Sequence, residues 1–132
     1  MHKLVLILAL LYTGAITYFS LIVMNFKVSV GGFDPTDKML HAGAYLFLCI
    51  LWKLFFILKS ADFRRYRANL YWVAIACFLF GMLIEVLQGT LTSYRTPDWW
   101  DGLANSTGVM LAVIFFLVMA PTFKKLKSRY SL

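Results

Sequence analysis

Four long apolar segments dominate the pattern of this chain. They cover residues 4–24, 38–58, 69–91 and 99–120, and each is close to the length that an α-helix needs to cross a bilayer. The connections are short, so successive helices should be antiparallel neighbours. The first segment is longer than the apolar part of a signal peptide, and we interpret it as a retained helix. The pattern predicts an all-α polytopic membrane protein, a four-transmembrane-helix bundle with a single domain over residues 1–132.

Polar positions are rare in these segments, and they gather near one end of each of the last three. They form the patterns Asp37-Lys38-x-x-His41-x-x-x-Tyr45, Glu85-x-x-Gln88 and Arg95-x-x-Asp98-x-x-Asp101-x-x-x-Asn105. In an antiparallel bundle these groups lie in the same half of the bilayer, and their helical spacing gives each group one face. Ionisable groups at the centre of a membrane helix cost about 2.5–3.5 kcal/mol each. The pattern therefore predicts that these residues form one ligand-binding site.

Two predicted helix starts point toward this site. Segments 34–35 (Asp-Pro) and 96–97 (Thr-Pro) each place an N-cap residue before a proline at the first helical position. Helix N-termini attract phosphate and other anions, and Lys38 and Arg95 lie nearby in the sequence. Small residues close to the same faces would let the helices approach closely. They are Gly81, Gly89 and Gly108.

The composition supports the membrane assignment. The chain is 61% hydrophobic and 14% charged, and a soluble domain of 132 residues could not bury that much apolar surface. Its net charge of +7 comes from basic residues beside the apolar segments, which indicates membrane orientation and not nucleic-acid binding. The positive-inside rule predicts cytoplasmic N- and C-termini and places the polar site in the outer leaflet. Lys53, inside the second segment, should snorkel toward water.

Each polar residue also has a simpler interpretation. Asp37 and Asp98 could satisfy first-turn backbone donors and the helix dipole. Gln88 and Asn105 could form hydrogen bonds between helices. Glu85 is harder to explain in this way, because deep in a membrane segment it has to pair with a base, stay protonated or bind a ligand. The common depth of these residues favours a site over separate structural roles.

The same motifs resemble the VanZ-like membrane family, which is named for a protein associated with teicoplanin resistance. Their order and spacing match over roughly residues 30–115, including Gly81 before Glu85 and the stretch Asn105-x-x-Gly108. The resemblance implies a small multi-pass helical protein of the cell envelope, in the bacterial inner (cytoplasmic) membrane. It also implies a link to glycopeptide antibiotic resistance.

The favoured function is binding of an anionic envelope lipid or a lipid-linked cell-wall precursor. Lys38 and Arg95 would contact the phosphate, while the acidic residues position them or hold a divalent ion such as Mg²⁺. We expect no other cofactor and no nucleic-acid partner.

Two alternatives stay open. The chain could be an accessory subunit of a larger membrane complex with protein partners, in which the polar cluster is an interhelical network. It could also be a membrane-embedded lipid phosphate or acyl hydrolase or transferase. In that case His41 is the general base, Asp37 or Glu85 orients it, and Asp98 and Asp101 hold Mg²⁺.

Overall fold

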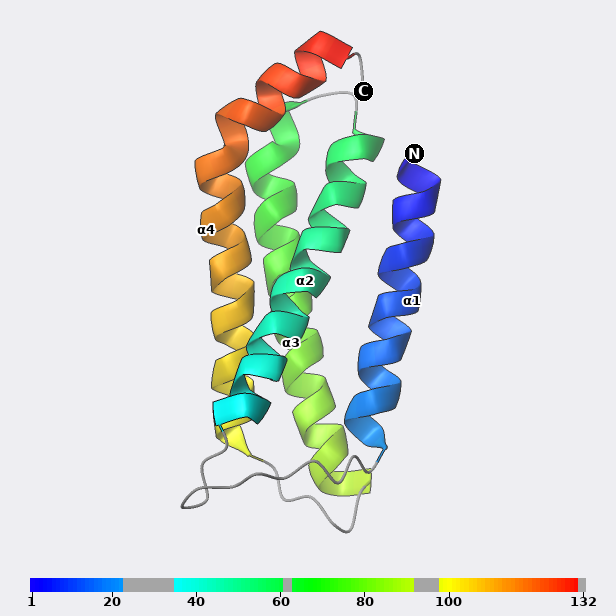
Figure 1. Ribbon diagram of the computed structural model, residues 1–132, viewed down its shortest axis with the longest axis vertical. Helices are drawn as coiled ribbons and strands as arrows, with labels where there is room; N and C mark the ends of the chain where they lie inside the picture. The colour runs from blue at the N-terminus through cyan, green and yellow to red at the C-terminus, as the bar shows by residue number, and fades with distance from the viewer. Residues whose placement is uncertain (23–34, 61–62, 92–97, 131–132) are drawn as a thin grey trace.

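Helices account for all the regular structure in the described part of this chain. The structure is a computed structural model that describes residues 1–22, 35–60, 63–91 and 98–130. Its elements are α1 (His2–Leu21), α2 (Pro35–Lys59), the short 3₁₀ helix η1 (Phe63–Arg65), α3 (Tyr66–Leu91) and α4 (Trp99–Tyr130). The four long helices run up and down beside one another (Figure 1), and all four are long and apolar enough to cross a membrane. The predicted four-helix membrane bundle is confirmed.

Two ends of the bundle differ in charge. The described acidic residues lie at the end of the bundle where α2 and α4 begin and α3 finishes. We call this end the acidic end. Its acidic residues are Asp37, Glu85, Asp98 and Asp101. At the opposite, basic end, α1 and α3 begin and α4 finishes (Figure 1). It holds Lys3, Lys59, Arg64, Arg65, Arg67, Lys124, Lys125, Lys127 and Arg129.

The core follows the length of the bundle in two clusters. The larger one joins α1, α2, α3 and α4 around buried side chains such as Tyr45, Cys49 and Cys77. The second lies toward the basic end and contains Tyr66, Leu70 and Phe116. Many large apolar side chains on the outside of the helices are exposed, among them those at positions 4, 72, 79 and 118. Such a surface suits contact with lipid chains, because the bilayer interior is as apolar as the core.

The first helix is the most loosely attached of the four. Only Ala9 and Ile16 of α1 are buried. Its described polar contacts include a hydrogen bond from the Tyr12 hydroxyl to the Ala44 carbonyl at 3.3 Å. A second runs from Trp52 Nε1 to Thr13 Oγ1 at 3.2 Å. Most of the surface of α1 therefore faces outward.

The most extensive helix contact joins α2 and α4. Gly108 of α4 lies against the backbone of α2: a Cβ at this position would overlap the Ala42 carbonyl oxygen and lie 2.9 Å from Leu46 N. Gly81 of α3 is also constrained, since its Cβ would lie 3.0 Å from Tyr45 Cε1. The close approach at Gly108 brings the first turns of α2 and α4 together, and these turns carry most of the polar residues.

At the basic end, α4 continues to Tyr130, beyond the predicted span that stops at residue 120. Pro121 lies inside this helix, and the helix leans toward α2 beyond it (Figure 1). The extension lets Lys127 Nζ donate to the carbonyl oxygens of Ile57, at 2.6 Å, and Ser60. These contacts cap the C-terminus of α2, where a cation is favoured by the helix dipole.

The expectation that Lys53 snorkels is wrong. Its side chain is 1% exposed, and its Nζ donates to the Tyr66 carbonyl oxygen at 2.7 Å. The same nitrogen lies 3.8 Å from the centre of the Tyr66 ring, so a cation–π contact adds to the hydrogen bond. The start of α3 supplies both groups, and the ammonium is stabilised inside the bundle without reaching its surface.

Candidate functional site

Lys38 lies at the centre of the polar group at the acidic end. Its Nζ is 2.6 Å from Asp98 Oδ2 and 3.6 Å from Asp37 Oδ2, and it donates a hydrogen bond to Asp101 Oδ1. The Lys38 side chain is 13% exposed, and that of Asp101 is 2% exposed. An ammonium surrounded by three carboxylates is more than neutralised, so the described group has a net negative charge when these acids are ionised.

Asp98 also starts α4. Its Oδ1 accepts a hydrogen bond from Trp100 N at 3.0 Å, and its carbonyl oxygen accepts one from Asp101 N at 2.9 Å. This is the geometry of an N-cap residue, so the helix begins one residue later, at Trp99. The expected cap at Thr96 with Pro97 lies outside the described residues. At the other predicted start, α2 does begin at Pro35, and Asp34 lies outside the described residues.

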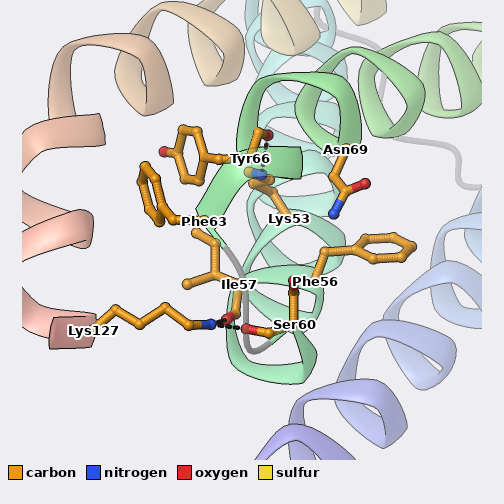
Figure 2. Close-up of a pocket in the computed structure, with 8 residues that line it drawn as sticks. All are labelled: Lys53, Phe56, Ile57, Ser60, Phe63, Tyr66, Asn69 and Lys127. Atoms are coloured by element: carbon orange, nitrogen blue, oxygen red, sulfur yellow. Dashed lines mark hydrogen bonds between the residues drawn. The ribbon is translucent and has the colours of Figure 1, made fainter. Parts of the chain in front are cut away.

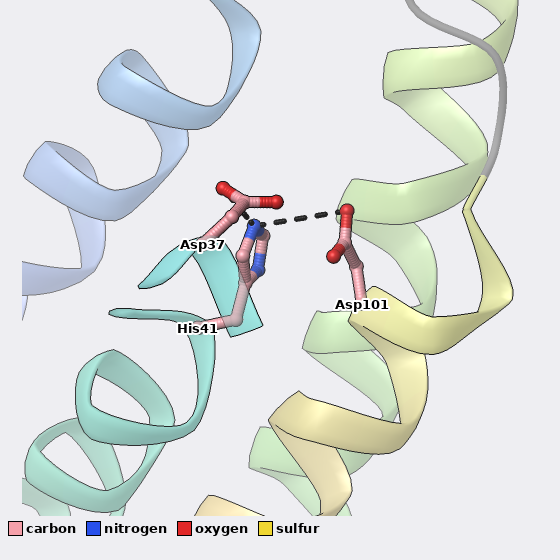
Figure 3. A group of neighbouring side chains, drawn as sticks. All are labelled: Asp37, His41 and Asp101. Carbon is pink, nitrogen blue, oxygen red and sulfur yellow. Dashed lines mark ion pairs between the residues drawn. The ribbon is translucent and has the colours of Figure 1, made fainter. Parts of the chain in front are cut away.

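His41 connects the two first turns. Its Nε2 is 3.7 Å from Asp37 Oδ1 and 3.8 Å from Asp101 Oδ2 (Figure 3). Its Nδ1 is 3.1 Å from Asn105 Oδ1. Because Asn105 donates its amide Nδ2–H to Glu85 Oε1 at 3.4 Å, its oxygen is turned toward His41. An amide oxygen only accepts, so His41 donates from Nδ1, and its Nε2 faces two carboxylates.

The arrangement around His41 Nε2 suits a cation. One ligand atom each from Asp37, His41 and Asp101 can lie within 4.8 Å of one another. In the neutral ring Nε2 is a lone-pair acceptor that meets two further acceptors, and this convergence is favourable only with a proton or a metal ion between them. Carboxylate oxygens and imidazole nitrogen are ordinary ligands for divalent ions. These three residues could therefore hold such an ion.

The polar group continues from this point into the bundle. Asn105 is 1% exposed and Glu85 is 8% exposed. Beside them, across Gly81, lies Tyr45, whose hydroxyl is buried and has no hydrogen-bond partner among the described residues. Exposure falls steadily from Asp98 at the surface through His41 to Asn105, so the group is a polar path that enters from the acidic end.

Comparison with known families fits this arrangement. A family model described as VanZ/LLP1 matches residues 4–120, from the first turn of α1 to the residue before the proline of α4. The chain belongs to the VanZ/LLP1 family. Searches of curated proteins and of solved structures give no match. For this VanZ/LLP1 protein the resemblance suggested by the polar motifs is confirmed at the level of the family.

The predicted site residues of this VanZ/LLP1 protein do not all meet at one point. Eight of them form the connected group described above: Asp37, Lys38, His41, Tyr45, Glu85, Asp98, Asp101 and Asn105. Gln88 instead reaches α1, where its Nε2 donates to the Ser20 carbonyl oxygen at 2.7 Å. Arg95 lies outside the described residues.

The structure shows which acidic residues hold Lys38. The sequence suggests a lysine that contacts phosphate and is positioned by nearby carboxylates, and two of its donors point to Asp98 and Asp101. Only the three-dimensional contact of α2 and α4 shows this pairing, because Asp98 and Asp101 follow Lys38 by 60 and 63 positions in the chain.

Proposed function

We propose that this VanZ/LLP1 protein binds the phosphate of an anionic envelope lipid through a divalent cation held by Asp37, His41 and Asp101. The observation that carries the proposal is the convergence of His41 Nε2 with two carboxylates, at 3.7 and 3.8 Å. A lipid-linked cell-wall precursor is the ligand of this class that would connect the site with glycopeptide resistance. By the positive-inside rule, the acidic end faces the outer leaflet of a bacterial inner membrane.

The chemistry of the described side chains favours a cation. Carboxylate oxygens of Asp37, Asp98 and Asp101 gather around Lys38 and His41. Mg²⁺ takes octahedral, oxygen-rich coordination and leaves positions open for substrate phosphates. Three protein ligands would leave such positions for phosphate, and Asp37 is the more exposed of the two acidic ligands.

Metal binding is tested first, with Mn²⁺ as a paramagnetic substitute for Mg²⁺. We expect the purified protein to remove Mn²⁺ from solution, measured as loss of the free-ion electron paramagnetic resonance signal. His41→Ala should weaken this binding by at least about 10-fold, the scale of losses at metal sites. His2→Ala removes the other histidine, at the basic end, and serves as the matched control. Equal binding by wild type and His41→Ala would refute the cation site.

Lipid binding is tested second. The protein is incubated with vesicles that contain polyprenyl phosphate and is then purified. We expect the purified protein to retain this lipid in Mg²⁺ and to lose the lipid in EDTA. The same comparison with His41→Ala should show no effect of Mg²⁺. Retention that is identical in Mg²⁺ and EDTA would separate lipid binding from the ion and contradict the proposed bridge.

A second candidate, an accessory subunit, is favoured by one observation. The polar contacts of Lys38 and His41 reach across from α2 to α4, so the group also works as a network that fixes the pairing of these helices. In that case His41→Ala should lower the stability of the bundle in EDTA and in Mg²⁺ by the same amount. A difference between the two conditions would favour the ion site.

A further inference from the structure

The basic end carries a second group of polar side chains that the proposed function does not use. Lys53 and Lys127 come from α2 and α4, and both lie beside a small cavity of about 10 Å³, room for one water molecule. Asn69 of α3 lines the same cavity, and Figure 2 shows the three side chains around it. Among the described residues, no carboxylate lies within ion-pair distance of Lys53 or Lys127.

These two lysines keep part of their capacity for an anion. Lys127 gives two of its three N–H donors to the carbonyl oxygens of Ile57 and Ser60, so one donor stays available. Lys53 bonds to the Tyr66 carbonyl and its ring, neither of which cancels its charge. Both therefore give a positive potential at this edge of the bundle.

An apolar groove begins at the same place. It has a volume of about 630 Å³, within the ~300–1,000 Å³ of ordinary ligand pockets, and it runs between α1, α2 and α3. Its walls include Trp52, Trp72 and Phe80, with Thr13 on the side of α1. Two further wall residues, Phe56 and Asn69, also line the small cavity beside the lysines, so the groove and the basic edge are continuous.

We propose that this groove is a selective site for an anionic phospholipid. One acyl chain lies along Trp52 and Trp72, and the phosphate meets Lys127 and Asn69 at the rim, with the buried charge of Lys53 behind them. Charge complementarity selects the headgroup, because the described charged residues on the rim, Lys53 and Lys127, are both basic. This site lies in the half of the membrane opposite to the carboxylate group and is independent of it.

The four tryptophans allow a direct test. Trp52 and Trp72 line the groove, whereas Trp99 and Trp100 start α4 at the acidic end. The double variant Trp99→Phe/Trp100→Phe thus keeps only the two tryptophans that line the groove. It is reconstituted in mixed vesicles of phosphatidylglycerol and phosphatidylcholine, with brominated acyl chains, which quench tryptophan fluorescence, on one lipid or the other. At equal mole fractions we expect brominated phosphatidylglycerol to quench more strongly; equal quenching would overturn the proposal.

Matched charge variants separate the site from general surface attraction. In this background, Lys127→Gln should lower the preference for phosphatidylglycerol about fivefold, a loss of about 1 kcal/mol, because it removes a cation from the rim of the groove. Lys125→Gln removes the same charge from an exposed position of α4 that does not line the cavity, and it should leave the preference unchanged. Equal losses in the two variants would reduce the effect to the charge of the tail and overturn the site.

A third variant keeps every charge. Ala76→Phe adds a ring to the wall of the groove and should lower quenching by brominated phosphatidylglycerol, because the acyl chain is displaced. Quenching that is unaffected by Ala76→Phe would show that the chain lies elsewhere.

Discussion

The pairing of Lys38 with Asp101 should be the main electrostatic contribution to stability at the acidic end. Lys38→Met keeps the apolar stem and removes the charge, so it leaves the Asp101 carboxylate, 2% exposed, without its lysine partner. Breaking a buried pair in this way costs about 3–5 kcal/mol. Asp101→Asn should lower the free energy of unfolding by less, about 1–3 kcal/mol. Lys38 then still has two carboxylate partners, Asp98 at 2.6 Å and Asp37 at 3.6 Å.

The double variant Lys38→Met/Asp101→Asn decides whether the pair is coupled. The double variant buries no unpaired charge from this pair. Its loss of unfolding free energy should therefore be smaller than the sum of the losses in the two single variants, by about 1–3 kcal/mol. The measurement is equilibrium unfolding in mixed micelles of a mild detergent and SDS, followed by helicity, with EDTA present throughout. Asp98→Asn is the control: Asp98 is 36% exposed and asparagine also caps helices, so we expect less than about 1 kcal/mol. Additive single losses would refute the reasoning.

Three further predictions concern packing, the ion and the buried acid. Gly108→Ala should lower the unfolding free energy by about 1–3 kcal/mol, because the added methyl group would meet the backbone of α2. Gly43→Ala is the control and should be nearly neutral, since a methyl group at this position has open space. Equal losses of unfolding free energy in the two variants would contradict the close approach of α2 and α4. Mg²⁺ at about 100 times its dissociation constant should stabilise the wild type by about 2.7 kcal/mol, measured by unfolding in Mg²⁺ against EDTA. His41→Ala should lack this gain, and a gain that survives the substitution would place the ion elsewhere. Glu85→Ala should reduce retention of polyprenyl phosphate more than Lys125→Ala, and the reverse order would remove Glu85 from the site.

Most of the architecture was predictable from two features of the sequence. The length of each apolar segment predicts the membrane spans, and the helical spacing predicts the face on which each polar residue lies. His41 and Asn105, or Lys38 and Asp101, could be expected in one half of the bilayer on this basis. The partners within that half were not predictable, since they depend on how closely α2 and α4 approach at Gly108.

Gln88 shows the limit of the helical argument. It follows Glu85 by three residues, so the two side chains share a face only to within a fraction of a turn. In the bundle that fraction matters: Glu85 meets α4 through Asn105, while Gln88 meets α1 at Ser20. The position of α1 beside α3 is a tertiary property, and the polar pattern does not contain it.

The basic residues show a different limit. Lys124, Lys125 and Lys127 look equivalent as a topology signal, yet only Lys127 reaches the carbonyl groups at the end of α2. The bend near Pro121 and the exact length of α2 decide this. The expectation that Lys53 snorkels failed for a similar reason. Its hydrogen-bond acceptor is the backbone carbonyl of Tyr66, and a backbone acceptor cannot be inferred from the pattern of side chains.

The same two helices are joined by a lysine at each end. At the acidic end Lys38 of α2 contacts carboxylates of α4, and at the basic end Lys127 of α4 contacts carbonyl groups of α2. Between these points Gly108 brings the two backbones into contact. The most extensive helix contact thus joins α2 to α4, whereas only Ala9 and Ile16 of α1 are buried. The lining of the proposed groove includes neither Lys38 nor Gly108, so we expect that the two proposed sites can be occupied together.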